Sequence, residues 1–136
     1  MTKYAVSYAA VLLTMLVVDG LWLGVVAKNF YQTNLAGLMA ERINFVAAAA
    51  FYLIYPIGVV YFAASAGIET GSWRDAAVRG LLFGFFAYAV YDLTNWATLR
   101  GFPFQVALVD MAWGSTLTGL AATLGMLAAR YIAPNT

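Results

Sequence analysis

The chain has 136 residues, of which 64% are hydrophobic and only 10% are charged. A soluble domain carries roughly 25% charged residues, so this chain could not cover itself with polar surface in water and belongs to the membrane-protein class. It contains no cysteine and no histidine, which excludes disulfides, thiolate ligands and imidazole chemistry, and its net charge of +1 gives no case for a nucleic-acid partner.

Four segments are long and apolar enough to cross a bilayer. They cover approximately residues 4–27, 43–66, 76–99 and 106–131. Each is expected to be a helix, because backbone groups in lipid must be hydrogen-bonded within their own segment. The sequence therefore predicts an all-α, polytopic membrane protein. Its single domain, residues 1–136, would hold four transmembrane helices in an up-and-down bundle.

The first segment follows Lys3 and has a cleaved signal peptide as its alternative interpretation. Its length, the presence of Asp19 and the lack of a small-residue cleavage site before Lys28 favour a transmembrane helix instead. An apolar run in a signal peptide is shorter and carries no acidic residue near its end. We therefore interpret residues 4–27 as the first span.

The connection between the first two segments, residues 28–42, is the longest in the chain. Leu35, Leu38 and Met39 share one helical face within it, and Asn34 is placed to cap the start of such a helix. A short helix lying at the membrane interface is expected here, with a plain loop as the alternative.

Small residues and one proline indicate how the predicted helices pack. Gly80 and Gly84 form a G-x-x-x-G pair in the third segment, and Gly114 and Gly119 lie on small-residue rows of the fourth. Helices in lipid approach closely through such residues, either within the bundle or in a homo-oligomer. Pro56 should kink the second helix, because proline has no N–H to donate.

The basic residues give a weak preference for orientation. Four spans place both termini on the side of the second connection, which carries four basic residues against three on the opposite side. The positive-inside rule then favours cytoplasmic termini. The residues are Lys3, Arg74, Arg79 and Arg130 on the terminal side, and Lys28, Arg42 and Arg100 on the other.

Three aspartates, Asp19, Asp92 and Asp110, lie inside the predicted spans. A carboxylate at membrane depth costs about 2.5 kcal/mol or more, so each should face a protein interior or a watery cavity. All three fall in the same membrane half, on the side of the first and third connections. Burial and mutual repulsion should leave one or more of them neutral at pH 7. Each aspartate could instead bond to a neighbouring helix and only fix the packing.

A tryptophan follows each of these aspartates by three or four residues, on the same helical face. Its indole N–H can donate to a carboxylate and its apolar rings can wall off a pocket; the alternative is an aromatic belt at the interface. Two asparagines are expected at the same depth. The predicted ligand-binding residues are Asp19, Trp22, Asn44, Asp92, Asn95, Trp96, Asp110 and Trp113.

No metal-binding spacing, nucleophile motif or cofactor fingerprint accompanies these residues, so neither a metal nor a cofactor is predicted. The favoured function is binding or transport of a small cation, a proton or a polar or lipid headgroup in the acidic pocket. A lipid-modifying membrane enzyme or its accessory subunit is one alternative, and a structural or assembly subunit is another. The expected partners are membrane lipids and a small cation or polar ligand.

Three motifs carry a resemblance to a known family. They are YDLTNWATLRG at Tyr91–Gly101, VDMAWG at Val109–Gly114 and DGLWL at Asp19–Leu23. They resemble the bacterial membrane proteins grouped as domain of unknown function 2177, over nearly the whole chain. The resemblance implies a small four-helix protein of the bacterial inner membrane. It implies no activity and carries over no catalytic residue.

Overall fold

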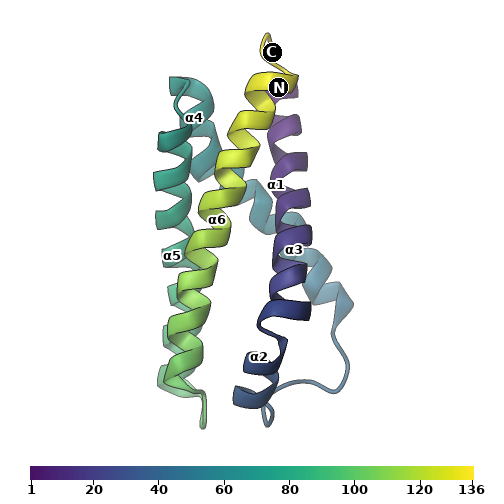
Figure 1. The fold of residues 1–136 in the computed structure, drawn as a ribbon, viewed down its shortest axis with the longest axis vertical. Helices are drawn as coiled ribbons and strands as arrows, with labels where there is room; N and C mark the ends of the chain where they lie inside the picture. Colours follow the sequence, from purple (N-terminus) through teal and green to yellow (C-terminus); the bar gives the residue numbers. More distant parts are fainter.

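The computed structural model describes all 136 residues as helices and connections, without any strand (Figure 1). The first pass consists of α1 (Thr2–Leu21) and a π-helical turn, η1 (Trp22–Val26), and is followed by the short α2 (Lys28–Asn34). A second pass combines α3 (Phe45–Val59), the π-helical turn η2 (Val60–Ala64) and α4 (Ser65–Thr70). The long helices α5 (Trp73–Thr98) and α6 (Phe104–Ile132) complete the chain.

Three helical segments are long and apolar enough to cross a membrane: Thr2–Val26, Phe45–Thr70 and Trp73–Thr98. They correspond to the first three predicted spans and confirm an all-helical chain with several membrane-spanning helices. Large apolar side chains such as Val25, Val46 and Phe86 point outward from these segments, as contact with lipid requires. The fourth predicted segment forms α6, which has 29 residues but is not among the three.

The chain folds up and down, as Figure 1 shows. Both termini lie at one end, which we call the terminal end, together with the connection from α4 to α5. The opposite end, which we call the α2 end, holds α2 and the connection from α5 to α6. Residues near the ends of α1 and α5 and near the start of α6 are therefore brought to the same level.

Helix α6 is the most buried element and packs against both α1 and α5. Its buried positions are mostly small, including Gly114, Thr118, Ala121 and Ala122. These residues allow the neighbouring helices to approach α6 closely. The main core forms where α6 meets α1 and η2. It consists of Val11, Met15, Val59, Val60, Ala63, Ala64, Leu117, Ala121 and Ala122.

The G-x-x-x-G pair of α5 packs within the chain, against α6. A Cβ atom added at Gly80 would lie 2.8 Å from the carbonyl oxygen of Thr118 and 2.9 Å from Cβ of Ala122. One added at Gly84 would collide with the carbonyl oxygen of Gly114. The two helices thus touch backbone to backbone along this row, and no larger residue fits there.

Pro56 lies inside α3, and the π-helical turn η2 begins four residues later. The second pass contacts α1 through α3 and α5 through η2 and α4, so it crosses the bundle obliquely (Figure 1). A proline that cannot donate to the preceding turn, followed by a widened turn, accounts for this course.

The first connection differs from the expectation in its details. A short helix is present, but it covers Lys28–Asn34 and ends at Asn34, where a helix start was predicted. The Asn34 amide donates to the carbonyl oxygen of Phe30 at 2.8 Å, and turns follow it. The apolar side chains of Phe30 and Tyr31 pack against Phe102 and Val106, which explains why the helix forms early: it covers the α5–α6 hairpin.

We expect Gly84→Ala to lower the free energy of unfolding by about 1–3 kcal/mol, because the added methyl group meets backbone atoms that cannot move aside. Gly20→Ala is the matched control, since nothing lies within 4 Å of the added atom and alanine favours the helix. Unfolding in mixed detergent micelles, followed by tryptophan fluorescence, measures both. Equal effects of the two substitutions would contradict the close packing.

Candidate functional site

The three aspartates of the predicted spans lie at the α2 end, on three different helices. Asp19 is near the end of α1, Asp92 near the end of α5 and Asp110 near the start of α6. Because these helix ends lie together in Figure 1, the carboxyl groups occupy one level of the bundle, which we call the acidic layer. Their side chains have very different surroundings.

The Asp19 carboxylate is fully satisfied by donors from two other helices. The Tyr52 hydroxyl of α3 donates to Oδ2 at 2.5 Å, and the Trp113 indole Nε1–H of α6 donates to Oδ1 at 2.9 Å. The residue is only 5% exposed. Hydrogen bonds from O–H and N–H donors to a charged acceptor are strong in a dry interior. Asp19 therefore ties α1, α3 and α6 together.

The two tryptophans link Asp19 to the second carboxylate. The rings of Trp22 and Trp113 stack with centroids 4.3 Å apart and planes 6° from parallel. The Trp22 Nε1–H donates to the Tyr31 hydroxyl at 3.2 Å, and that hydroxyl donates to Oδ1 of Asp110 at 2.9 Å. Each indole thus serves a group on another element, rather than the aspartate one turn before it.

Tyr31 keeps its proton in this arrangement. It lies on α2, outside the spans, and burial raises the pKa of its hydroxyl well above the usual range, while the bond from Trp22 acts in the opposite direction. The hydroxyl therefore stays an O–H donor to Asp110 at any pH at which the protein would be studied. Asp110 therefore has one hydrogen-bond donor, the Tyr31 hydroxyl of α2.

Asp92 is the exception in the acidic layer. Its side chain is 0% exposed, and neither Oδ1 nor Oδ2 has a hydrogen-bond partner. The carboxyl group of Asp92 interacts with that of Asp110. The hydroxyl groups of Tyr31 and Tyr91 are close enough to Asp92 to interact with it electrostatically. Buried polar atoms are nearly always paired, so two unpaired oxygens next to a second acceptor require an explanation.

The remaining predicted site residues are less central. Asn95 is half-buried beside Tyr91, one turn after Asp92. Trp96 is 48% exposed and packs on Phe104 with centroids 4.8 Å apart, as expected for the interfacial belt. Asn44 lies on the exposed surface and caps α3, where its side chain accepts from the Ala47 N–H at 3.1 Å. The structure thus brings together Asp19, Trp22, Asp92, Asp110 and Trp113.

The tyrosine donors were not predicted from the sequence. Tyr52 lies within a span that contains no acidic residue, so nothing in its own segment marks it as a carboxylate partner. Tyr31 lies in the connection for which a loop or a later helix was expected, so its depth could not be inferred. One feature of the sequence could have indicated them: the predicted spans contain more carboxylate acceptors than amide donors, so hydroxyl groups are needed as further donors.

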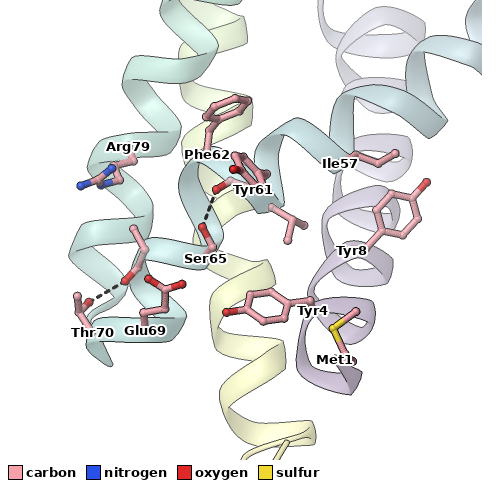
Figure 2. Close-up of a pocket in the computed structure, with 12 residues that line it drawn as sticks. Met1, Tyr4, Tyr8, Ile57, Tyr61, Phe62, Ser65, Glu69, Thr70 and Arg79 are labelled. Carbon is pink, nitrogen blue, oxygen red and sulfur yellow. Dashed lines mark hydrogen bonds between the residues drawn. The ribbon is translucent and has the colours of Figure 1, made fainter.

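Two cavities of the molecule lie away from the acidic layer. One of about 960 Å³ is lined by residues of the terminal end, including Tyr4 and Arg79 (Figure 2), and another of about 220 Å³ lies near Lys3 and Arg130. Neither is lined by any of the three aspartates, so the pocket expected around them is not one of these two. No group of three or more carboxylates is placed to hold a metal ion.

The apolar helices, the outward-facing large side chains and the buried carboxylates together define an integral membrane protein. A family model described as "Predicted membrane protein (DUF2177)" matches residues 4–127. The chain belongs to this family, as its motifs indicated. No curated protein and no solved structure matches the chain.

We expect Tyr31→Phe to lower the free energy of unfolding by about 1–3 kcal/mol, because Asp110 then loses its donor and Trp22 its acceptor. Tyr131→Phe is the control: Tyr131 is 73% exposed near the end of α6 and its hydroxyl bonds to nothing in the chain. Detergent-micelle unfolding compares the two variants. A loss of the same size in both would rule out a specific bond from Tyr31.

Proposed function

We propose that this protein spans the bacterial inner membrane four times and binds a proton between Asp92 and Asp110. Proton binding, or transport of a proton or small cation that depends on it, is the function that the acidic layer supports best. This proposal builds on the finding that the chain belongs to a family of membrane proteins. The argument rests on the unpaired, fully buried Asp92 carboxyl.

Four spans follow from the length and position of α6. Its 29 residues extend about 43 Å at 1.5 Å per residue, enough to cross about 30 Å of hydrocarbon. Its small residues face other helices, so its modest hydropathy reflects an interior position rather than an aqueous one. Both termini then lie on one side, and the basic residues favour the cytoplasm. Helix α2 would lie at the opposite interface.

A shared proton resolves the conflict between the two carboxyl groups. Two ionised carboxylates about 4 Å apart repel by about 4 kcal/mol at an effective dielectric constant of about 20. Neither oxygen of Asp92 has a donor that could offset this repulsion. One bound proton removes a charge and also supplies an O–H donor from one carboxyl to the other. A single bound proton therefore both removes the repulsion and supplies the missing hydrogen-bond donor.

Larger ligands fit this position less well. Hard cations such as Ca²⁺ take six to eight oxygen ligands, whereas the acidic layer offers a pair of carboxyls and no group of three. A lipid headgroup would need an opening, and the 960 Å³ cavity lies at the other end of the bundle. The proton needs neither additional ligands nor volume.

Access to the pair is from the α2 end. Asp110 is only partly buried and is bonded to Tyr31 on α2, whereas Asp92 is fully covered. Towards the terminal end the core of Val11, Met15, Val59 and Leu117 is apolar, apart from the bonded hydroxyl groups of Tyr55 and Thr118. Proton binding from one side thus needs no rearrangement, and transport across the membrane would need the core to open.

The contacts of Asp19 favour a structural role for this residue within the acidic layer. Both of its oxygens accept bonds from other helices, so its charge is compensated without a ligand. We assign Asp19 to the assembly of the bundle and Asp92 with Asp110 to proton binding. The two roles make opposite predictions for substitution by asparagine.

We expect infrared spectra of the reconstituted protein at pH 7 to contain the C=O stretch of one protonated carboxylic acid. Asp92→Asn should abolish this band while the protein stays folded, because the amide N–H can donate to Asp110. Asp75→Asn, in the first turn of α5 at the terminal end, is the control and should keep the band. Parallel proton-uptake measurements should show one proton fewer in Asp92→Asn.

Two results would overturn the proposal. One is a wild-type spectrum without any protonated carboxyl at pH 7. The other is an Asp92→Asn protein that keeps the band and differs from the wild type only in stability. Asp19→Asn is expected to behave in the opposite way: it should lose stability, because one of the two acceptor oxygens becomes an NH2 group that faces a donor, and keep the band.

A further inference from the structure

The cavity at the terminal end has an apolar wall and a charged rim (Figure 2). Its volume is about 960 Å³, and it lies between α1 on one side and η2, α4 and the start of α5 on the other. Ile57, Val60 and Phe62 contribute its apolar wall. The cavity lies between the first pass and the oblique second pass, which contacts α5 rather than α1 at this end.

The cavity is open towards the membrane. Of its apolar lining, Tyr61 is 73% exposed and Ile57 58% exposed, and both lie in a segment apolar enough to span a bilayer. Hydrocarbon chains, rather than water, therefore surround this opening at the depth of Ile57. An acyl chain that enters would fill a volume that the side chains of the protein leave unpacked and would gain dispersion contacts with its apolar wall.

The rim carries one acidic and one basic side chain, Glu69 of α4 and Arg79 of α5. Both are exposed, and Figure 2 draws no hydrogen bond to either. The neighbouring hydroxyls are already used: Ser65 donates to the carbonyl oxygen of Tyr61 at 2.6 Å, and Thr70 donates to Asp75 at 2.6 Å. The two charged side chains are thus left to bind a ligand, together with the hydroxyl groups of Tyr4 and Tyr61.

The depth of Arg79 favours a counter-charge near its guanidinium group. It lies about 9 Å along α5 from Trp73, well inside the helix that spans the membrane. A guanidinium at that depth is costly unless its long side chain reaches the interface or an anion comes to it. Glu69, in the last turn of α4, offers the opposite charge at the same rim.

We propose that this cavity binds a phospholipid with a zwitterionic phosphoethanolamine headgroup. The lipid phosphate would pair with Arg79, whose planar guanidinium binds two phosphate oxygens at once, and the primary ammonium would donate to Glu69. One acyl chain occupies the apolar wall formed by Ile57, Val60 and Phe62. The charges of the rim match a headgroup that carries both signs, whereas an anionic headgroup leaves Glu69 unpaired.

Native mass spectrometry of the purified full-length protein tests this site with phosphatidylethanolamine and phosphatidylglycerol of identical acyl chains. The wild type should retain phosphatidylethanolamine more tightly than phosphatidylglycerol. Glu69→Gln should abolish that preference, and Arg79→Gln should weaken binding of both lipids about tenfold, through loss of a charge-assisted contact. Ala66→Phe, which fills the cavity, should weaken both without lowering the folded yield.

The control for Arg79→Gln is Arg74→Gln, because Arg74 stands near the same end but does not line the cavity. Asp92→Asn should bind lipid as the wild type does, so failure of this site and failure of proton binding are separate results. Equal retention of the two lipids by the wild type would overturn the proposal. So would unchanged binding by Arg79→Gln and Ala66→Phe, or a second copy of the chain held across the cavity in place of lipid.

Discussion

The contact between α5 and α6 is the constraint on which the rest of the structure depends. Gly80 and Gly84 allow the backbone of α5 to touch that of α6 at Thr118 and Gly114. Because the two helices run antiparallel from the short connection at residues 99–103, this contact also sets their register. Two turns beyond Gly84, the same face of α5 presents Asp92 to Asp110. The burial of an unpaired carboxyl is thus a direct consequence of how closely the helices approach. A wider spacing would admit water and remove the conflict between the two acids.

The acidic layer divides its carboxyl groups between two physical roles. Asp19 accepts from Tyr52 and Trp113, so each of its oxygens has a donor from another helix. Asp92 has no donor at all, and its neighbour Asp110 has one, from Tyr31. The stacked indoles of Trp22 and Trp113 stand between these two environments and connect them. Three acidic residues at one level therefore do not form one site. Within the acidic layer, only Asp92 is left without any hydrogen-bond partner.

Much of this arrangement could be predicted from the sequence, because lipid imposes strict rules on a chain. Helix positions followed from apolar length, and the common level of Asp19, Asp92 and Asp110 followed from their distance to the helix ends. Interactions between helices could not be predicted in the same way, because rotation of each helix about its axis depends on packing. This is why Trp113 was linked with its own helix but donates to Asp19 on α1. It is also why Asn44, at the correct depth, turned out to cap α3 on the surface.

The oblique course of the second pass explains why the two ends of the bundle differ. At the α2 end, α3 stays near α1, which lets Tyr52 reach Asp19, and α2 packs over the α5–α6 hairpin. Beyond Pro56 and the π-helical turn the same segment moves to α5, which leaves a cavity beside the start of α1. One end is therefore closed around carboxyl groups, and the other is open towards lipid. If the cavity holds a lipid, that lipid replaces the packing that the second pass no longer provides at the terminal end. A chain of this size could then remain stable with its polar interactions concentrated at the α2 end.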